Sequence, residues 1–434
     1  MTVRFEIDGV PAYVESAPWV PLVSMVVALR SGAVLDPPGK DGVCRFMARL
    51  VRRGCEGMTS PEIETAIDRL GSELTLDVGP STMSFQGQVI RRNLEPFVDL
   101  FTRVIGKPTF DETEAQRLRR ESIAEVIDSR DSDRALTMLA FRRALFKDHL
   151  YARAAAGRPS TLETLTRDDA VAAYKRHVVR SDVVLGFAGA ITEDEAKAIG
   201  ARILAAIPEG PPATLSIPEP ERPKGRHLCF VDKPDRAQMP TLIGTLGTHP
   251  KDPDHFPLIL ATAAFGGTFT SRMMKEIRSK RGWSYGTSAR LSIERRRHSF
   301  VMSAAPGAND CPPCIKLQIE MLEELVEKGI TPRELGFIKN FLVRSHAFEI
   351  DTAAKRLGQA LEVELLELPK DYHSAYVDRV KAVVLEQSNA ALKERLTPQD
   401  LVVVVVGTAS ETLEKVKESI PSLESTTVIP FESD

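Results

Sequence analysis

Apolar and polar residues recur along this chain with the two periods that distinguish strands from helices. Residues 182–191 (DVVLGFAGAI) form an apolar run of strand length, and residues 191–204 have the apolar spacing of an amphipathic helix. The same pair recurs in residues 400–409 (DLVVVVVGTA) and in the SETLEKVKESI segment that follows. A shift of about 220 residues is too long for a solenoid unit, so it indicates duplication of a whole domain.

The remaining pattern predicts the same course of elements in both halves. In the first half we expect strands at 4–14, 22–30, 74–78 and 83–89 and helices at 42–53, 60–71, 94–105 and 111–127. In the second half we expect strands at 241–246, 288–292 and 298–304, helices at 256–264 and 271–279, and further long helices. Ser60 is predicted as a helix N-cap with Pro61 in the first turn. Asp111 with Glu114 is predicted to start a helix as a capping pair.

A proline-dense segment divides the chain. Residues 208–226 show no apolar periodicity and are predicted to be an extended linker between domains 1–207 and 227–434. Antiparallel strand pairs with grouped helices indicate an α+β fold. We therefore predict two duplicated α/β sandwich domains, each a mainly antiparallel sheet with helices packed on one face.

Composition narrows the class of protein without indicating a function. Of the 434 residues, 43% are hydrophobic and 27% charged, which is typical of a soluble globular protein. The net charge of −3 gives no reason to expect nucleic acid or an anionic membrane as a partner. No apolar run reaches the ~18 residues of a membrane span, and the first residues show no signal-peptide pattern. Five cysteines make no disulfide framework, so we expect the cytoplasm, with the periplasm as the alternative.

Two segments resemble a known family. Residues 29–74 (LRSGAVLDPPGKDGVCRFMARLVRRGCEGMTSPEIETAIDRLGSEL) are similar to the first catalytic helix region of the pitrilysin/insulinase zinc metallopeptidases, or inverted zincins, whose helix carries H-x-x-E-H. Residues 265–286 (FGGTFTSRMMKEIRSKRGWSYG) resemble a second-half segment of that family with an arginine and a later tyrosine, here Arg278 and Tyr285. The resemblance covers nearly the whole chain. It implies the bacterial processing-peptidase-like branch and two domains arranged as a clamshell.

The zinc motif of that family is replaced in this chain. Its H-x-x-E-H positions fall on Arg45, Ala48 and Arg49. In the family, two histidines four residues apart lie on one helical face and bind one zinc, and the glutamate takes a proton from the metal-bound water. Arginine has no lone pair for a cation, and alanine cannot act as a base. The resemblance therefore implies a chain that binds no zinc and cannot hydrolyse peptides by itself.

The third zinc ligand of the family, a glutamate on a later helix, corresponds to Glu125. A lone carboxylate facing two guanidinium groups is not a zinc site. We hypothesise that Glu125 pairs with Arg45 or Arg49, and that this ion pair replaces the metal as a bridge between two helices. In the alternative, Arg45, Arg49, Arg52 and Arg53 form a solvated basic face of the helix.

The histidines suggest no rival metal site. None forms an i, i+4 pair with an adjacent acid, as H-E-x-x-H requires. The eight are His149, His177, His227, His249, His255, His298, His346 and His373. We expect each to be a surface residue or a hydrogen-bonded core residue.

The cysteines allow one further candidate site. Cys311 and Cys314 form a C-x-x-C before an amphipathic helix, and a helix N-terminus lowers the pKa of a thiol, so a redox role is one hypothesis. No thioredoxin-like context surrounds the motif, and a plain helix start is the alternative. Cys44, Cys55 and Cys229 have apolar neighbours and are predicted to be small core residues.

The resemblance assigns Arg278 and Tyr285 to substrate binding. In the family these side chains reach across a closed chamber and hydrogen-bond the substrate carbonyl near the scissile bond, where a donor stabilises oxyanion charge. The alternative is that Tyr285 packs at a strand start, because an R-x6-Y spacing often arises by chance. Gly266 and Gly267 are predicted to serve a tight turn or a close approach of substrate backbone, since glycine accepts positive φ. A purely structural role is the alternative for both.

Family members occur as single long chains, as homodimers and as heterodimers with divided labour. A retained arginine–tyrosine pair beside a replaced zinc motif resembles the non-catalytic subunit of the divided type. We therefore expect a substrate-binding subunit of a heterodimeric zinc endopeptidase, whose H-x-x-E-H partner supplies the zinc and the general base. The alternative is a metal-free scaffold or peptide-binding protein with no peptidase role.

Overall fold

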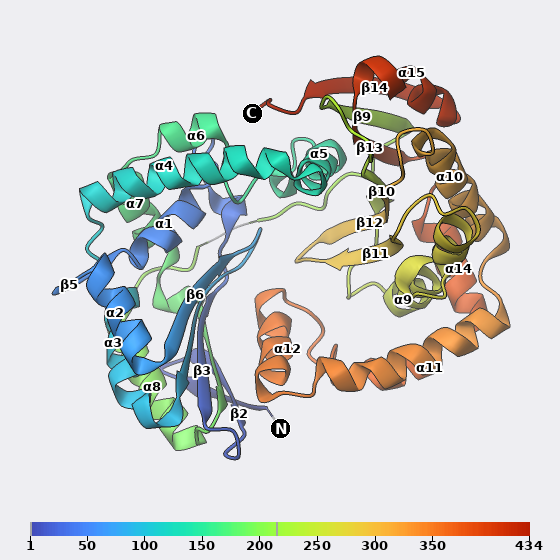
Figure 1. Cartoon of the computed structure of the whole chain (residues 1–434). Helices are drawn as coiled ribbons and strands as arrows, with labels where there is room; N and C mark the ends of the chain where they lie inside the picture. The colour runs from blue at the N-terminus through green and yellow to red at the C-terminus, as the bar shows by residue number, and fades with distance from the viewer. Residues whose placement is uncertain (1, 214–215) are drawn as a thin grey trace.

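A computed structural model of the protein describes residues 2–213 and 216–434 and contains two six-stranded mixed sheets (Figure 1). The first sheet has the order β1 (Val3–Ile7), β2 (Val10–Ser16), β8 (Val183–Gly189), β3 (Leu22–Leu29), β7 (Met83–Ile90), β6 (Ser72–Val78). The second has the order β11 (Thr287–Ile293), β12 (Arg297–Ala304), β10 (Thr241–Leu246), β13 (Leu401–Gly407), β9 (Arg226–Asp232), β14 (Leu423–Pro430). A short ladder joins β4 (Gly54–Cys55) to β5 (Met58–Thr59).

The predicted duplication is confirmed by strand order and direction. In the first sheet, β8 runs parallel to β2 and antiparallel to β3. In the second sheet, β13 likewise runs parallel to β9 and antiparallel to β10. The outermost strands differ, because β1 is antiparallel to β2 whereas β14 is parallel to β9. Most of the other pairings are antiparallel, as predicted.

Each half has its own set of helices. The first half contains α1 (Val43–Val51), α2 (Ser60–Leu70), α3 (Leu94–Gly106), α4 (Glu112–Asp128), α5 (Asp133–Phe146), α6 (Pro159–Glu163), α7 (Arg167–His177) and α8 (Glu193–Ala206). The second contains α9 (His255–Thr262), α10 (Cys311–Lys328), α11 (Pro332–Glu349), α12 (Ala353–Leu365), α13 (Tyr376–Ala382), α14 (Leu385–Arg395) and α15 (Ala409–Ser419). Two π-helical segments, η6 (Ala263–Gly267) and η7 (Met274–Lys280), follow α9.

One helix of each half crosses to the sheet of the other half, which corrects the prediction of helices on one face only. Successive strand residues point to opposite faces. On β8, Leu185 and Phe187 enter the core beneath the first-half helices, whereas Val184 and Ala188 pack against α12. On β13, alternate valines pack in the same way against α5. The continuous apolar runs of β8 and β13 indicate strands buried on both faces, but not which helix covers the second face.

Glycines permit the close approach of both crossing helices. A Cβ atom at Gly186 of β8 would lie 2.9 Å from Leu361 of α12. A Cβ atom at Gly244 of β10 would lie 2.8 Å from the ring of Phe141 of α5. The two halves are therefore held together by α5, which packs on the second sheet, and by α12, which packs on the first sheet.

Three local predictions can be compared with the structure. The single strand expected at 4–14 is two strands, because Asp8 (φ 49°) and Gly9 (φ 79°) form a hairpin turn. The N-cap of α2 is Thr59 rather than Ser60, and the Glu62 side chain accepts from the Thr59 amide at 2.8 Å. The capping start of α4 is confirmed by the Asp111 carboxylate, which accepts from the amide of the third residue after it.

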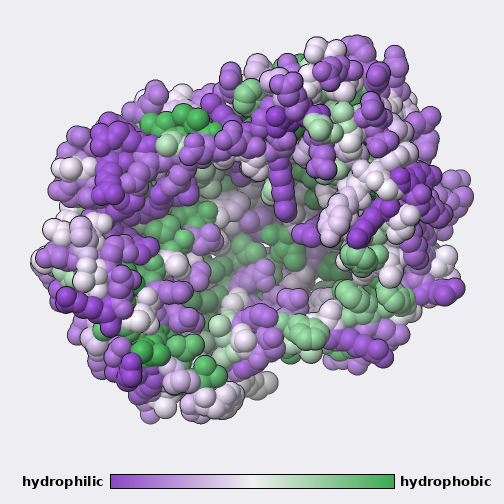
Figure 2. Space-filling model, in the orientation of Figure 1, coloured by the Kyte–Doolittle hydropathy of each residue, from purple (hydrophilic) through white to green (hydrophobic). Residues whose placement is uncertain are grey.

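The proline-dense segment lies against the body of the protein. Ile217 is buried beneath α5, and the Pro218 carbonyl lies 2.9 Å from Nε2 of His149. Arg226 already belongs to β9, so the extended part ends before it, and residues 214–215 of the predicted linker lie outside the described residues. The boundaries at 207 and 227 stay a prediction. The face drawn in Figure 2 is hollowed between the two halves. No helix among the described residues is long and apolar enough to cross a membrane.

Candidate functional site

Helix α1 presents two arginines to α4. It begins after Gly42, whose φ is 95°, and the buried carboxylate of Asp36 accepts from the amides of Gly42 (2.6 Å) and Cys44 (3.0 Å). Burial outweighs these hydrogen bonds and raises the pKa of Asp36 to about 7. Arg45 and Arg49 are one turn apart, so they lie on the same face of α1. That face packs against α4.

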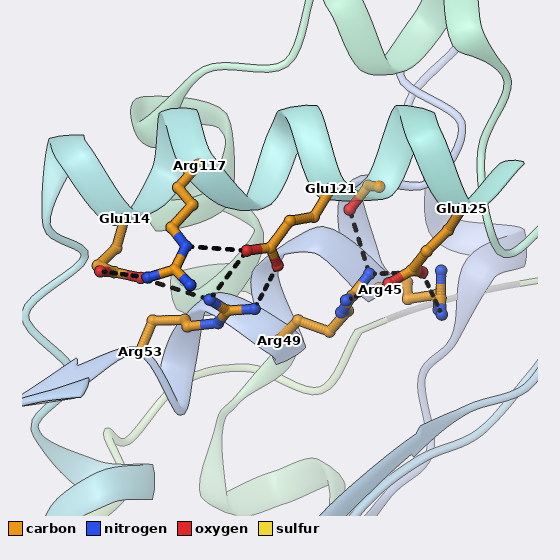
Figure 3. A network of polar contacts seen from close by, with 8 residues as sticks. Arg45, Arg49, Arg53, Glu114, Arg117, Glu121 and Glu125 are labelled. Carbon is orange, nitrogen blue, oxygen red and sulfur yellow. Dashed lines mark hydrogen bonds and ion pairs between the residues drawn. The ribbon is translucent and has the colours of Figure 1, made fainter. Parts of the chain in front are cut away.

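Glu125 of α4 receives both guanidinium groups (Figure 3). Arg49 donates through Nη1 to Oε2 at 2.9 Å and through Nη2 to Oε1 at 2.6 Å, which is a bidentate pair. Arg45 donates through Nη2 to Oε2 at 3.2 Å. The Ser122 hydroxyl accepts a further hydrogen bond from Arg49 at 3.2 Å. The predicted pairing of Glu125 is confirmed with both arginines, so these two residues are not a solvated basic face.

The ion pairs continue along α4 (Figure 3). Arg53 Nη2 lies 2.5 Å from Glu121 Oε2, and its Nη1 lies 3.5 Å from Glu114 Oε2. Arg117 Nε donates to the same Glu121 carboxylate at 3.0 Å. Arg52 points elsewhere and pairs with a glutamate of α2. The predicted ion-pair bridge between two helices is therefore a network along α1 and α4.

Charge complementarity keeps these carboxylates ionised. Partial burial pushes the pKa of Glu125 upward, but the hydrogen bonds and charges of Arg49 and Arg45 outweigh burial and hold it below its usual value. In Glu121, Arg53 and Arg117 likewise outweigh burial and lower the pKa. At neutral pH the network therefore consists of full charges of both signs.

The residues at this position do not fit a zinc ion. Arg45 and Arg49 have no lone pair to donate, and both carboxylate oxygens of Glu125 accept from them. Ala48, at the position of the family's general base, is fully buried in the first-half core. Within residues 2–213 and 216–434, no group of three His, Cys, Asp or Glu side chains could hold a metal ion. The side chains at this position therefore support no step of metal chemistry.

Arg278 lies in η7, a π-helical segment where a regular helix was predicted. Its guanidinium carbon is 4.4 Å from the ring centre of Phe269 and 4.9 Å from that of Tyr285, so it is stacked between two aromatic rings. Tyr285 is 89% exposed and Phe269 is 73% exposed. The guanidinium makes no ion pair or hydrogen bond within the described part of the chain. No ion pair, hydrogen bond or ring contact joins it to the network around Glu125 within those residues.

A local hydrogen-bond pattern holds Tyr285 outward. The hydroxyl of Ser284, a buried residue, donates to the Gly286 carbonyl at 2.6 Å and accepts from the Ala305 amide at 3.0 Å. These bonds fix the backbone on both sides of Tyr285 against the second sheet. The exposure of the ring is therefore a consequence of the turn, and the alternative that Tyr285 packs into a strand start is wrong.

The two glycines before Phe269 have different roles. Neither has a positive φ, so the conformational reason predicted for them is wrong. Gly266 is buried against β11, and a Cβ atom there would lie 2.3 Å from the Ala289 backbone nitrogen. Gly267 is exposed, and a Cβ atom there would lie 3.2 Å from the Ala263 side chain and 3.9 Å from the Thr262 carbonyl oxygen. Packing alone explains Gly266, whereas a substrate contact stays a prediction for both.

Two residues at these sites escaped the sequence analysis. Phe269 flanks Arg278, but a single phenylalanine in a loop gives no periodic signal that separates it from a core residue. Asp36 holds the start of α1 from outside the helix, beyond the spacing of an ordinary N-cap. The Pro37-Pro38 pair beside it, which excludes a helix there, was the available sign of a structured loop.

The C-x-x-C motif is structural in this fold. Cys311 and Cys314 are fully buried in the second-half core at the start of α10. Burial raises the pKa of both thiols, that of Cys314 to about 12, so neither is poised as a thiolate. Cys44 and Cys55 are core residues, as predicted, and Cys229 is partly buried.

Comparisons with known proteins agree with this geometry. The family model for insulinase (peptidase family M16) matches residues 12–157, and that for the peptidase M16 inactive domain matches residues 164–342. A Helicobacter pylori protein named non-peptidase homolog YmxG is 19% identical over 400 residues, covering 92% of this chain and 91% of that protein. An uncharacterized zinc protease of Rickettsia bellii is 22% identical over 283 residues, 65% of this chain and 68% of that protein. The crystal structure of a peptidase M16 inactive domain from Pseudomonas fluorescens superimposes with a TM-score of 0.86 at 23% identity, covering 99% of each chain.

The duplicated sandwich, with an ion-pair bridge at the helix pair of an inverted zincin, defines a metallopeptidase-like class of protein. This chain belongs to the peptidase M16 (insulinase) family. The resemblance identified from the two sequence segments is therefore confirmed. Within the family, it is a chain whose zinc motif is replaced and which is similar along most of its length to a non-peptidase homolog.

Proposed function

We propose that this chain is the non-catalytic, substrate-binding subunit of a heterodimeric zinc endopeptidase. A homologous partner with H-x-x-E-H supplies the zinc and the general base, and this chain supplies Arg278 and Tyr285. The observation that carries the proposal is the Arg278 guanidinium, which stacks between two exposed rings and makes no ion pair within the described residues. A preorganised cationic donor of this kind suits the developing charge on a substrate carbonyl.

The position of Tyr285 suggests how a peptide reaches this donor. Strand β11 is an edge of the second sheet and begins two residues after Tyr285. An extended peptide can add to a free sheet edge through main-chain hydrogen bonds. A peptide paired with β11 would pass beside Tyr285 and Arg278, so its carbonyl groups would come within reach of both donors.

The test is co-expression with a homologue from the same organism that carries H-x-x-E-H. Native mass spectrometry should then find one copy of each chain and about one zinc per pair, since a catalytic site holds a single metal. Arg278→Ala should lower turnover of an unfolded peptide about a hundredfold, the effect of one oxyanion donor. Tyr285→Phe should lower turnover less, and Lys415→Ala on the exposed face of α15 is the matched control.

Native mass spectra must show that each variant still assembles with its partner, so that a lower turnover reflects substrate binding. Unchanged turnover in both Arg278→Ala and Tyr285→Phe would contradict the substrate-binding role. Purification of the chain from its own cells, alone or as a metal-free homodimer, would contradict the divided-labour assembly.

A metal-free peptide-binding protein or scaffold is the second candidate. The observation that favours it is the name of the Helicobacter pylori relative, a non-peptidase homolog that aligns with most of this chain. Under this candidate, the native complex contains no zinc, and Arg278→Ala weakens peptide binding without any peptidase activity to lose.

A further inference from the structure

Exposed aromatic side chains are concentrated in one part of the molecule. Among the described residues, six Phe, Tyr or Trp side chains are largely exposed, and five of them lie between residues 269 and 348. These five are Phe269, Tyr285, Phe337, Phe341 and Phe348. The sixth is Trp19, on the loop between β2 and β3. Clustered exposed apolar residues on a protein surface mark a binding surface more often than scattered ones do.

Three of these rings form a line along the outer face of α11. Positions 333, 336, 337, 340, 341, 344, 347 and 348 are all exposed and follow the helical period. The opposite face is packed, with Leu335 and Ile338 in the second-half core. The outer face of a surface helix is normally polar. Here it carries three phenylalanines and two arginines, and the acidic residues beside it are Glu334, which is paired with Arg272, and Glu349 at the end of the helix.

An ion pair connects α11 to the segment that carries Phe269, Arg278 and Tyr285 (the Arg278 region). Arg272 pairs with Glu334 of α11 through Nε (2.6 Å) and Nη2 (2.7 Å), and Nη2 also donates to the Gly329 carbonyl at 2.9 Å. Phe269 precedes Arg272 by three residues, and Phe337 follows Glu334 by one helical turn. Helix α11 also packs against η6, which leads into Phe269. In Figure 2, hydrophobic residues gather over α11 at the right-hand rim of the hollow.

Three arginines of this surface have no acidic partner among the described residues. Arg278, Arg333 and Arg344 make no ion pair or side-chain hydrogen bond in the described residues. Other exposed cations of the same half do find partners, such as Lys328 with Glu324 and Lys355 with Asp351. Guanidinium groups beside phenyl rings favour a ligand that carries both carboxylates and large apolar side chains. A basic ligand would be repelled by the three arginines.

We propose that the α11 stripe (Arg333, Phe337, Phe341, Arg344 and Phe348) binds unfolded peptide segments rich in acidic and large apolar residues. This inference rests on the proposed function, since it names the class of peptide that the Arg278 region receives. The apolar side chains of the peptide pack on the phenylalanines, and its carboxylates pair with Arg333 and Arg344. The segment bound at Arg278 is then one part of a longer contact that continues along α11.

The test measures binding of a fluorescein-labelled peptide to the full chain by fluorescence polarisation. The probe is a 16-residue peptide of Leu, Phe and Glu. One comparison peptide has Lys in place of Glu, and another has Ser in place of Leu and Phe. Wild-type protein should bind the probe at least about tenfold more tightly than either comparison peptide, the effect of one to two hot-spot contacts.

Two variants of the stripe should weaken binding of the probe about tenfold each. One is Phe337→Ser with Phe341→Ser, and the other is Arg333→Glu with Arg344→Glu. The second should also reverse the preference toward the Lys peptide. The matched controls, Trp19→Ser and Lys415→Glu, should bind as wild type does. Phe348→Ser alone, at the 71% exposed end of the stripe, replaces the double variant if that variant does not fold.

Stripe variants that bind the probe as wild type does, or a wild type that prefers the Lys peptide, would overturn the proposal. If Arg278→Ala abolishes binding while the stripe variants bind normally, the proposed function stands and this inference fails. If the stripe variants bind peptide normally but lose the partner chain or a second copy in sedimentation, the stripe is a subunit interface and the inference also fails.

Discussion

Two arginine-bearing surfaces of this chain differ in how their charges are satisfied. On α1, Arg45 and Arg49 both reach Glu125, and Arg49 does so through two parallel hydrogen bonds. In η7, Arg278 has aromatic neighbours but no acidic partner within the described residues. The same type of side chain therefore joins two helices in one place and lies partly exposed between two aromatic rings in the other. The difference lies in whether the fold places a carboxylate within reach.

This comparison indicates what each surface is for. Removing a metal ligand set would leave Glu125 without a cation between two packed helices. The guanidinium groups of Arg45 and Arg49 supply that positive charge where the resemblance places the family's histidines, so the helix contact needs no zinc. At Arg278 no acidic partner is present among the described residues, and a partly exposed donor without an ion pair contributes little to folding. Satisfied charges at the first surface indicate a structural role, and the unpaired charge at the second is available for the substrate contact that we propose.

The largest expected effect comes from restoring metal ligands on α1. Arg45→His with Arg49→His places two imidazoles one turn apart opposite Glu125. We expect this double variant to bind about one zinc per chain, measured by elemental mass spectrometry after dialysis. Adding Glu125→Gln removes the third ligand and should release most of the metal. Equal zinc content with and without Glu125→Gln would mean that α4 is not positioned as a metal-site helix.

The next largest effect is on stability, and it tests whether Gly266 and Gly267 of η6 are needed for packing. Gly266→Ala should destabilise the protein by about 3 kcal/mol, because the added methyl group would overlap the backbone at Ala289. Gly267→Ala is the matched control and should change stability by less than about 1 kcal/mol. Both are measured as urea midpoints. Similar values for the two variants would show that space beside β11 is not the reason for Gly266.

The ion-pair bridge should have a measurable but moderate effect on stability. Glu125→Gln leaves two guanidinium groups without their anion, so we expect a loss of about 1 kcal/mol in the free energy of unfolding. Glu56→Gln removes a pair that is exposed on both sides and should cost close to nothing. Urea titrations of both variants give the comparison. A loss for Glu125→Gln no larger than that for Glu56→Gln would mean that the bridge does not hold α1 to α4.

The same bridge has a defined pH dependence. The pKa of Glu125 is lower in the folded protein than in the unfolded chain, so the folded state binds fewer protons at this group. Its contribution is therefore complete above the ordinary glutamate pKa of about 4.3 and is lost as the pH falls through the lower folded value. The stability gap between wild type and Glu125→Gln should shrink at acidic pH. A gap of constant size from neutral pH to about pH 3 would contradict the electrostatic origin.

The smallest expected effect concerns Arg278. Arg278→Ala should change stability by less than about 0.5 kcal/mol, as for a surface residue with no buried partner. Arg49→Ala is the matched comparison and should cost more, because it breaks the bidentate pair. Thermal unfolding of the two variants measures the difference. An Arg278→Ala variant that unfolds as readily as Arg49→Ala would identify Arg278 as a structural residue.

Much of the fold follows from local sequence pattern. The apolar strand of residues 182–191 and its repeat 218 residues later, from 183 to 401 in the structure, predicted the duplication. The positions of most helices followed from their apolar period and capping residues, as at Asp111. The hairpin at Asp8 and Gly9 carried a clear turn signal that the strand pattern concealed. The π-helical form of η6 and η7 has no counterpart in the apolar period.

The candidate site divides in the same way. Replacement of the zinc ligands and the pairing of Glu125 with arginine followed from residue chemistry, because an isolated carboxylate between two cations has one favourable arrangement. The stacking of Arg278 on Phe269 could not be predicted from residue chemistry, because this contact depends on the path of η6 and η7. The aromatic face of α11 also escaped the sequence analysis, since an amphipathic pattern identifies an apolar face but not which face is covered.

The sequence by itself determined the family, the doubled architecture and the loss of metal ligands, because these depend on residue type and on spacing along the chain. Only the tertiary structure decided that α5 and α12 each pack on the sheet of the other half, and that the backbone of Ala289 leaves no room for a side chain at Gly266. It also decided that Arg278, Arg333 and Arg344 have no acidic partner within the described residues. Those features depend on which distant segments meet. Local periodicity shows that an apolar face must be buried. It does not show which helix or strand packs against that face.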